Sequence, residues 1–416
     1  MLRNLFNIIN TKSKKFYFLT PLPYSIGDSV EQIMSANSIC VKEKRNLVII
    51  KVFFLKSLLK YKICNEALYK NLKYQSRLNL IEKIFIVLTT TLIVNISFVI
   101  KRIIALLFLK FLKIKLPEHF FFPDIGCHHY YSDNISISGK FLKPRTIKVN
   151  NLDLNNIKIH QKDEIKCIEI LKRQKIDTAK KFVCIHIRDG AFKNDGNRKN
   201  RTIRNSNILL YNSGIKYLLD LGYVVFRIGR ISNVQLNFSH KNLIDYPFCN
   251  FKSDLMDMFL IQNCKFYIGN MSGPLEVAYM FNKPTLLLDG YRIFENYPRN
   301  KNCLATFKKI ILNKKKITLK EYISLNYKYH HWRDYDDEII MNESNEKEIT
   351  ETIKNYIQFL NSDEENKVHD LKKLKKYLYK YLYKKYLKII NIGPQDDIQF
   401  IKKSLYWIKS SKGYYY

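Results

Sequence analysis

Between residues 182 and 290 the sequence alternates short apolar runs with amphipathic segments, and no other feature limits the fold as strongly. The apolar runs have the length and β-branched content of buried strands, and the segments between them repeat apolar residues at helical spacing. Strands that alternate with helices through short connections form a parallel, doubly wound sheet. We therefore predict an α/β fold, with strands at 182–187, 223–229, 242–247, 265–270 and 284–290 and helices at 207–222, 253–264 and 275–281.

The first 150 residues contain the beginning of the same pattern. Residues 15–21 and 46–54 indicate strands, and a glycine turn opens a helix at 25–34 between them. A chain of 416 residues is long enough for two compact domains, each with its own core. We predict an N-terminal α/β domain at 1–165, a C-terminal α/β domain at 166–344, and C-terminal helices at 345–416.

The C-terminal helices are predicted from two segments of different character. Residues 345–360 form an amphipathic pattern with an acidic first half, and residues 371–390 form a second one rich in lysine and tyrosine. A basic amphipathic helix suits an anionic membrane surface. The alternative is a solvated helix that closes the fold, and both interpretations stay open.

Residues 84–100 carry no charge and are followed by Lys101 and Arg102. This run is shorter than the roughly 20 apolar residues of a spanning helix, and it contains Thr, Asn and Ser. We expect a buried strand or helix of the first domain, with docking on a membrane surface as the next alternative and a spanning helix as the last. The N-terminus lacks the apolar run of a signal peptide, so we expect a cytoplasmic protein that could lie peripherally on the inner face of the plasma membrane.

The formal net charge of +34 creates a surface that attracts phosphates, anionic lipid headgroups or nucleic acid. Nucleic-acid binding is the main alternative to an enzyme on this ground. The basic residues are spread along the whole chain and form no nucleic-acid-binding motif, so we expect no nucleic-acid partner. The eight cysteines include no Cys-x-x-Cys pair, which favours buried free thiols in a reducing compartment.

Two predicted strands end in charged residues that suit an anionic ligand. His186, Arg188 and Asp189 lie at the end of the first strand of the alternating region, and Arg227 lies near the end of the second. Ligands of open α/β sheets bind beyond the carboxyl ends of the strands. Each residue also has a structural alternative, because His186 could be an ordinary core histidine and Arg227 could pair with Asp245.

A third strand passes through Ser272 and Gly273 into a helix, with Glu276 in its first turn. Backbone amides at a helix N-terminus bind phosphate oxygens, aided by the helix dipole. The alternative is an ordinary N-cap turn followed by a favourable acid. Two arginines and a helix N-terminus at the ends of strands in one sheet together predict a diphosphate site.

Several common nucleotide motifs are absent. The chain has no Walker lysine motif and no Gly-x-Gly-x-x-Gly after a strand, which argues against ATP hydrolysis and nicotinamide chemistry. No Asp-x-Asp triplet occurs in the sheet region. We therefore expect no metal and no cofactor.

Six sequence blocks carry a resemblance to known proteins. They are HIRDGAF, RTIRNSNILLY, LGYVVFRIGR, LIDYP, SDLMDMFLIQNCKFYIGNMSG and FNKPTLLLDG. Together they resemble a family of bacterial glycosyltransferases found with surface-polysaccharide genes. More distantly they resemble the α1,6- and protein O-fucosyltransferases, which share a His-x-Arg motif. A further block, SGPLEVAYMFNKP, is similar to the donor-site loop of GT-B glycosyltransferases and sugar-nucleotide epimerases.

The resemblance implies a GT-B fold, in which two Rossmann-like domains face a cleft and the C-terminal one holds a nucleotide-diphosphate sugar. The N-terminal domain would then lie on the acceptor side. The implied activity is sugar transfer to a glycan or a lipid-linked acceptor in cell-surface polysaccharide synthesis. A sugar-nucleotide epimerase, which shares the donor loop, is the alternative enzyme.

The resemblance also implies roles for individual residues. Arg188 would hold the β-phosphate of the donor, and His186 would orient the donor or its loop. The family has a histidine after the glycine of its first turn, where this chain has Asp28. The other donor-binding residues that we predict are Arg204, Asn205, Arg227, Ser272, Gly273 and Glu276.

Departure of the nucleotide is the demanding step of such a transfer. Arginines and helix-end amides can stabilise the developing diphosphate charge without a metal. A carboxylate near the acceptor would remove its proton, and Asp28 and Asp189 are the candidates.

Overall fold

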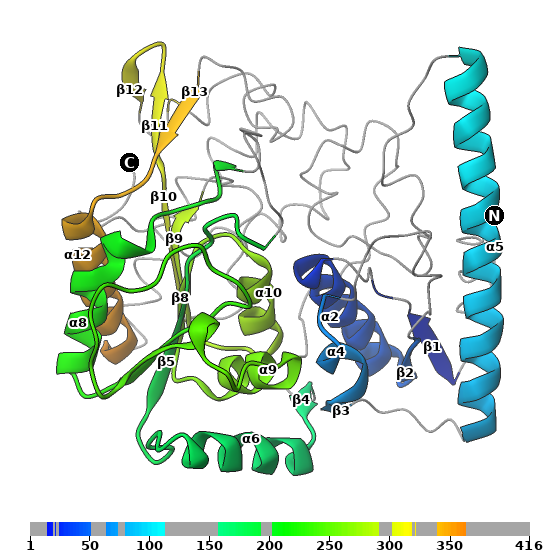
Figure 1. Cartoon of the computed structure of the whole chain (residues 1–416), viewed down its shortest axis with the longest axis horizontal. Coiled ribbons are helices and arrows are strands. Elements are labelled where there is room, and N and C mark those ends of the chain that lie inside the picture. The colour runs from blue at the N-terminus through cyan, green and yellow to red at the C-terminus, as the bar shows by residue number, and fades with distance from the viewer. Residues whose placement is uncertain are drawn as a thin grey trace. The chain divides into compact units, whose positions relative to one another are not determined.

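The computed structural model of the chain describes residues 15–19, 21, 25–50, 64–73, 80–112, 157–192, 202–290, 302–317, 321 and 339–362. These residues fall into two compact units (Figure 1). The first contains the described residues up to 112 together with 157–160, and the second contains those from 161 onward. Each unit is described by itself below.

The first unit begins with a strand–helix–strand motif, as predicted. β1 (Phe16–Leu19) and β2 (Asn46–Ile49) pair in parallel, and α2 (Ile26–Glu43) connects them. Val30, Ile33 and Met34 bury one face of α2. A short helix, α4 (Ala67–Lys70), leads into β3 (Leu72–Lys73), which pairs antiparallel with β4 (Lys158–Ile159).

Residues 84–100 lie within a single long helix, α5 (Leu80–Leu112). The expectation that this run would be buried is wrong, because many of its apolar side chains are exposed; Leu88 and Leu92, for example, are each 63% exposed. Among the described residues, no helix has both the length and the apolar character needed to cross a membrane.

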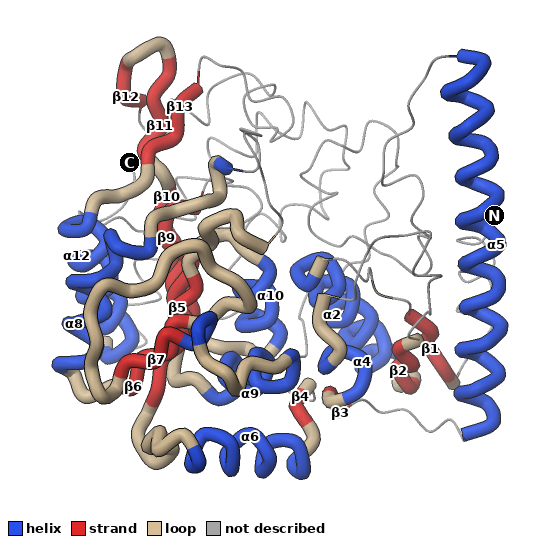
Figure 2. Tube along the Cα trace, viewed as in Figure 1, coloured by secondary structure: helices blue, strands red, loops and turns tan. Residues whose placement is uncertain are grey.

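The second unit is built on a six-stranded parallel sheet, which confirms the predicted α/β class (Figure 2). Five strands lie where the apolar runs predicted them, and the sixth, β10, was not predicted. The strands are β5 (Phe182–His186), β6 (Val224–Arg227), β7 (Leu243–Asp245), β8 (Tyr267–Gly269), β9 (Thr285–Gly290) and β10 (Cys303–Phe307).

The order of the strands across the sheet is β10-β9-β8-β5-β6-β7. From β5 the chain moves outward through β6 and β7, then returns to the other side of β5 with β8 and moves outward again. This is the order of a Rossmann-type sheet, and its direction reverses between β5 and β8.

Helices cover both faces of the sheet (Figure 1). One face carries α8 (Asn212–Asp220), which follows the short η3 (Ile208–Tyr211), and α12 (Glu346–Asn361). The other face carries α9 (Asp254–Asn263) and α10 (Gly273–Met280), with α6 (Gln161–Arg173) packed against α9. Ser253 caps α9 by accepting a hydrogen bond from the amide of Met256 at 3.0 Å, as predicted.

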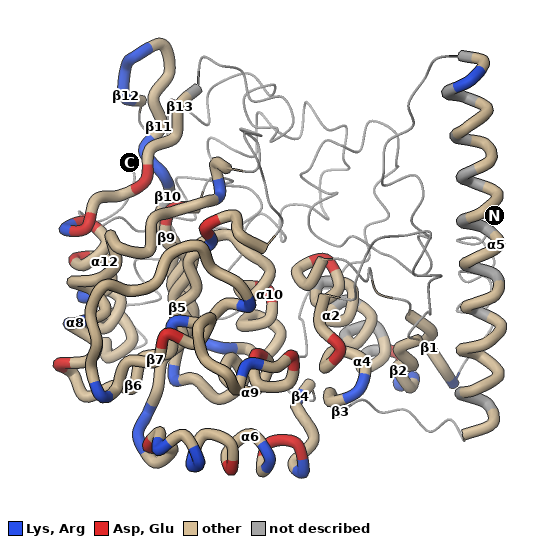
Figure 3. The backbone as a smooth tube through the Cα atoms, in the orientation of Figure 1, with Lys and Arg blue, Asp and Glu red and all other residues tan. Residues whose placement is uncertain are grey.

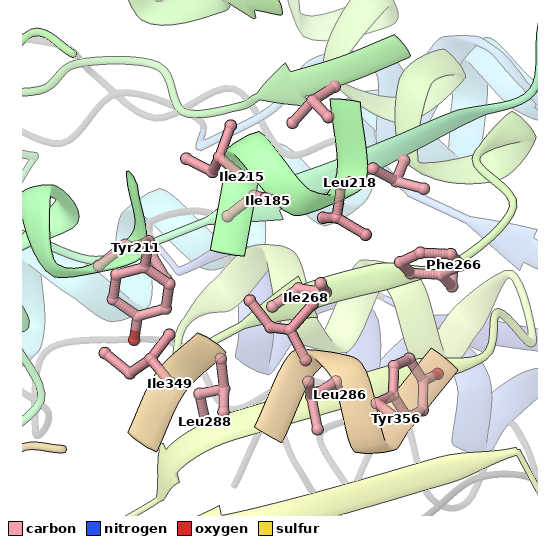
Figure 4. Close-up of a cluster of buried hydrophobic side chains, with 14 of the residues drawn as sticks. Ile185, Tyr211, Ile215, Leu218, Phe266, Ile268, Leu286, Leu288, Ile349 and Tyr356 are labelled. Carbon is pink, nitrogen blue, oxygen red and sulfur yellow. The ribbon is translucent and has the colours of Figure 1, made fainter. Parts of the chain in front are cut away.

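Helix α12 belongs to the core of the second unit (Figure 4). We expected it to begin a separate C-terminal segment, but Ile349, Ile353 and Tyr356 are fully buried against α8 and the sheet. A Cβ at Gly214 of α8 would lie 2.5 Å from Cδ1 of Ile353, so the two helices meet where α8 has no side chain. The basic segment 371–390 lies outside the described residues.

A small antiparallel sheet connects β10 to α12. Its strands are β11 (Lys309–Leu312), β12 (Lys315–Ile317) and β13 (Ile339–Asn342). α12 then begins with a capping box, in which the side chains of Asn345 and Glu348 accept hydrogen bonds from each other's backbone amides. The seven cysteines in the described ranges are free thiols, as expected.

Candidate functional site

The carboxyl ends of β5 and β8 lie side by side at the point where the strand order reverses. His186 ends β5 and is in register with Gly269, which ends β8. A Cβ at position 269 would lie 2.8 Å from the carbonyl oxygen of His186, so only glycine allows this approach. The loop after β5 therefore meets the loop that leads into α10.

Ser272 and His186 connect these two loops. The Oγ of Ser272 lies 3.0 Å from Nδ1 of His186 and donates to the carbonyl oxygen of Asn270 at 3.2 Å. The Ser272 hydroxyl has a single proton, which it donates to the carbonyl oxygen of Asn270. In that arrangement Nδ1 of His186 carries a proton and donates it to Oγ of Ser272. The remaining ring nitrogen, Nε2, then carries a lone pair.

Burial, and secondarily the Arg227 guanidinium, lower the pKa of His186 to about 4. The imidazole is therefore neutral at physiological pH.

Because the side chain of Ser272 contacts His186, it does not cap the N-terminus of α10. Ser272 is the N-cap residue and has an extended backbone, but its side chain makes no capping hydrogen bond. Gly273 opens the helix, and Glu276 lies half-buried in the first turn. The first-turn amides and the positive end of the helix dipole are thus not capped by the residue that would ordinarily cap them.

Asn270, which the sequence analysis did not single out, organises the arginines of the site. It is fully buried; its Oδ1 accepts from the backbone amide of Arg188 at 3.0 Å, and its Nδ2 donates to the carbonyl of Arg204 at 3.0 Å. An asparagine directly after a glycine-ended strand was the available signal.

The predicted residues Arg188, Arg204 and Asn205 come together as a result. The guanidinium of Arg188 donates to the side-chain oxygen of Asn205, and the carbonyl of Arg188 accepts from the amide of Ser206 at 2.9 Å. The Nε of Arg204 is buried and has no hydrogen-bond partner within the described ranges. A buried donor without a partner is uncommon in a folded protein, and a bound ligand is one way to satisfy it.

Lys308 is a second residue that the sequence analysis missed. It follows β10, is only 7% exposed, and its Nζ donates to the carbonyl of Asn205 at 3.0 Å. Burial lowers the pKa of Lys308, while nearby Asp289 and Glu343 oppose that shift. Lys308 therefore holds the backbone of Asn205 in place through this hydrogen bond.

Asp289, whose negative charge lies near Lys308, is itself held in place by hydrogen bonds. Its carboxylate is buried at the end of β9 and accepts hydrogen bonds from the amide and the hydroxyl of Ser344 at 3.0 and 2.8 Å. Its φ of 52° is left-handed, a conformation that non-glycine residues adopt only where their surroundings impose it.

Asp189 does not have the environment of a catalytic base. Its carboxylate accepts from Ser232 Oγ at 2.6 Å and from the amides of Asn233 and Ala191 at 2.7 and 3.0 Å. Burial by itself would raise the pKa of Asp189, but these hydrogen bonds outweigh it and hold the pKa below its usual value. The geometry favours a role in fixing the loop after β5, and catalysis by Asp189 stays a prediction.

Arg227 forms the ion pair that was its structural alternative. Its side chain is 1% exposed, and Nη1 lies 2.8 Å from Oδ1 of Asp245. Nη2 donates to Ser232 and to the carbonyl of Val234. Because Ser232 also binds Asp189, these contacts position the loop, and a direct donor contact by Arg227 stays a prediction.

Asp28 lies half-buried in the first turn of α2, in the first unit. Its predicted role as a base therefore remains a sequence-based expectation. No group of three or more His, Cys, Asp or Glu side chains within the described ranges is arranged to hold a metal ion.

Three solved structures are distantly similar to the chain. A family 9 glycosyl transferase from Veillonella parvula has 13% identity and a TM-score of 0.32, with 50% of this chain and 54% of that one covered. The ADP-heptose LPS heptosyltransferase II of E. coli has 11% identity and a TM-score of 0.44, with 84% and 100% covered. The dodecameric iron-containing heptosyltransferase TibC, in complex with ADP-D-β-D-heptose, has 13% identity and a TM-score of 0.25, with 44% and 48% covered.

The chain thus spans about half the length of two of these proteins. At these TM-scores the likeness is too distant to assign an activity. No family model and no curated protein matches the sequence.

Proposed function

We propose that the chain is a glycosyltransferase of the GT-B type, which moves a sugar from a nucleotide-diphosphate sugar to a glycan or lipid-linked acceptor of the cell surface. One observation carries the proposal. The N-terminus of α10 lies beside the loop of Arg188, at the point where the strand order of the sheet reverses. The hydroxyl of Ser272, the N-cap residue of α10, contacts His186 and does not cap the helix. Such a place suits a diphosphate, because helix-end amides and an arginine both complement its charge.

The proposed donor site has distinct parts. The amides after Ser272 and the guanidinium of Arg188 bind the diphosphate, and Glu276 binds a hydroxyl of the ribose or sugar. The buried Nε of Arg204 supplies a further donor. Asn205 orients Arg188 by accepting from its guanidinium.

The transfer itself needs no covalent intermediate on the protein. The acceptor oxygen bonds to the anomeric carbon while the bond from that carbon to the diphosphate oxygen breaks, and the electron pair stays on the diphosphate. Arg188 and the amides of α10 stabilise this developing charge. The acceptor proton passes to a base, for which we propose Asp28. His186 is neutral, and we propose that it holds the donor loop through Ser272.

Thermal shift with ADP, GDP and UDP and their sugars tests the proposal. At least one nucleoside diphosphate should raise the melting temperature of the wild type and of Arg173→Ala, an exposed arginine on α6, but not of Arg188→Ala. If none of these ligands stabilises the wild type, the diphosphate site is wrong. Release of free nucleoside diphosphate on incubation with an acceptor extract supports transfer, whereas an isomerised nucleotide-sugar without release identifies the epimerase.

A further inference from the structure

Helix α5 carries most of the exposed large apolar side chains in the described part of the chain. Fourteen of its large apolar side chains are exposed, whereas all other described elements together expose seven. Six of the fourteen recur at intervals of four residues and are between 50% and 72% exposed. These are Leu80, Ile84, Leu88, Leu92, Ile96 and Ile100. Soluble proteins rarely expose a contiguous apolar surface of this extent unless it contacts a membrane or a partner.

Two polar side chains of this helix make hydrogen bonds to its own backbone. Thr89 Oγ donates to the carbonyl of Phe85 at 2.8 Å, and Asn95 Nδ2 donates to the carbonyl of Thr91 at 2.7 Å. In water such donors bind solvent without cost. Bonds back to the helix satisfy them in a medium that offers no partners, which is the situation in lipid.

The charges in the C-terminal third of α5 complement an anionic surface. Residues 84–100 carry no charge, and the residues that follow include Lys101, Arg102 and Lys110 but no acid. Lys110 is exposed, and its Nζ lies 5.7 Å from the ring centre of Phe111. Lysines beside apolar surface keep the ammonium in water while the stem and its neighbours are buried. In Figure 3, most of the described residues of α5 are uncharged.

From the exposed apolar side chains, the internally satisfied polar groups and the flanking basic residues, we propose that α5 buries its exposed face in an anionic lipid membrane. We choose the membrane as the occupant because anionic headgroups complement the basic residues that follow the uncharged run, and a second copy of the chain is an outcome of the test below. The proposal does not depend on the sugar-transfer activity.

Sedimentation of the full-length protein with vesicles tests the proposal. The vesicles contain equal parts phosphatidylglycerol and phosphatidylcholine, with pure phosphatidylcholine for comparison. Leu88→Asn with Leu92→Asn should weaken binding to the anionic vesicles at least about tenfold, because both side chains leave the lipid. A matched variant, Ile165→Asn with Leu221→Asn, removes similarly exposed apolar groups elsewhere and should bind as wild type.

Salt separates insertion from simple charge attraction. At about 0.5 M salt, exposed charges are screened within a few ångströms, so binding that depends on the basic residues alone is lost, while the α5 contribution persists. If the double variant binds vesicles as tightly as wild type, the proposal is wrong. If the variant instead converts a dimer to a monomer in light scattering with unchanged vesicle binding, the face belongs to a second copy and the proposal is also overturned.

A single exposed position reports insertion directly. Leu92→Trp places an indole on the exposed face, and its emission should shift to shorter wavelength with anionic vesicles and be quenched by brominated acyl chains, relative to wild type. An indole that remains unquenched contradicts burial of α5 in lipid.

Discussion

Replacing Arg188 with alanine tests the proposed donor site most directly. The substitution removes the guanidinium but leaves the main-chain bonds of this position, which join its amide to Asn270 and its carbonyl to Ser206. The loop after β5 should therefore keep its path, and the loss should fall on ligand binding and catalysis rather than on folding.

The expected magnitudes follow from these contacts. Loss of the side-chain bond to Asn205 should cost about 1 kcal/mol of stability. For a domain of this size that corresponds to a fall of about 2–4 °C in melting temperature. Loss of a charge-assisted phosphate contact should raise the transition-state barrier by about 2–4 kcal/mol. The rate should then fall about 30- to 1,000-fold.

The assay is release of nucleoside diphosphate from the nucleotide-sugar that stabilises the wild type, with melting temperature measured on the same samples. Arg188→Lys should recover little of the activity, because an ammonium cannot make the forked contact of a guanidinium. Arg173→Ala controls for the loss of one positive charge. Turnover close to wild type in a folded Arg188→Ala variant would refute the assignment of the donor site.

Five further substitutions test the residues around Arg188. Gly273→Val should weaken nucleoside diphosphate binding more than it lowers the melting temperature. Glu276→Gln should weaken binding of the nucleotide-sugar but not of the free nucleoside diphosphate. If both variants bind both ligands as tightly as the wild type does, the donor binds elsewhere. The pKa of His186 is about 4 in the folded chain and about 6.5 when unfolded. As the pH falls from about 6.5 to about 4, the unfolded state binds the proton first, so the free energy of unfolding should fall by up to about 3 kcal/mol. His186→Gln should remove this slope in thermal melts, and parallel pH profiles would contradict it. Asp189→Asn should cost about 2 kcal/mol in urea unfolding at neutral pH. Because the folded pKa of Asp189 is lowered, this contribution exists above about pH 4 and is lost as the pH falls below it, so a variant as stable as wild type at neutral pH would refute the loop-fixing role. Lys308→Met should lower nucleoside diphosphate affinity by about 1 kcal/mol through the lost bond to Asn205, and calorimetric titration with unchanged affinity would remove Lys308 from the site.

The elements of the second unit could be predicted because their signals are local. A strand such as β5 is visible as a run of apolar residues, and α9 as a capping serine followed by helical spacing. The same local signals predicted the β1–α2–β2 motif of the first unit. They also located the candidate residues, since a charged group directly after a strand can be recognised without knowing which strand is its neighbour.

Local signals failed where an element's environment depends on distant residues. The burial of α12 depends on Gly214 of α8, which lies far earlier in the chain. The apolar stripe of α12 does not reveal this contact, so α12 was assigned to a separate C-terminal segment. The uncharged run of α5 was expected to be buried because its composition resembles a core, and composition does not show what lies outside the helix. β10 and the antiparallel strands after it were not recognised.

The alternation of strands and helices and the residues at the strand ends can be recognised in the amino-acid sequence alone, because periodicity and caps act over a few residues. How those residues are used depends on the tertiary contacts. The pairing of β5 with β8 turns the hydroxyl of Ser272 toward His186. The packing around β6 commits Arg227 to Asp245, and the packing around β10 brings Lys308 behind Asn205. These contacts join residues distant in sequence, and their geometry depends on strand order, which no local pattern encodes.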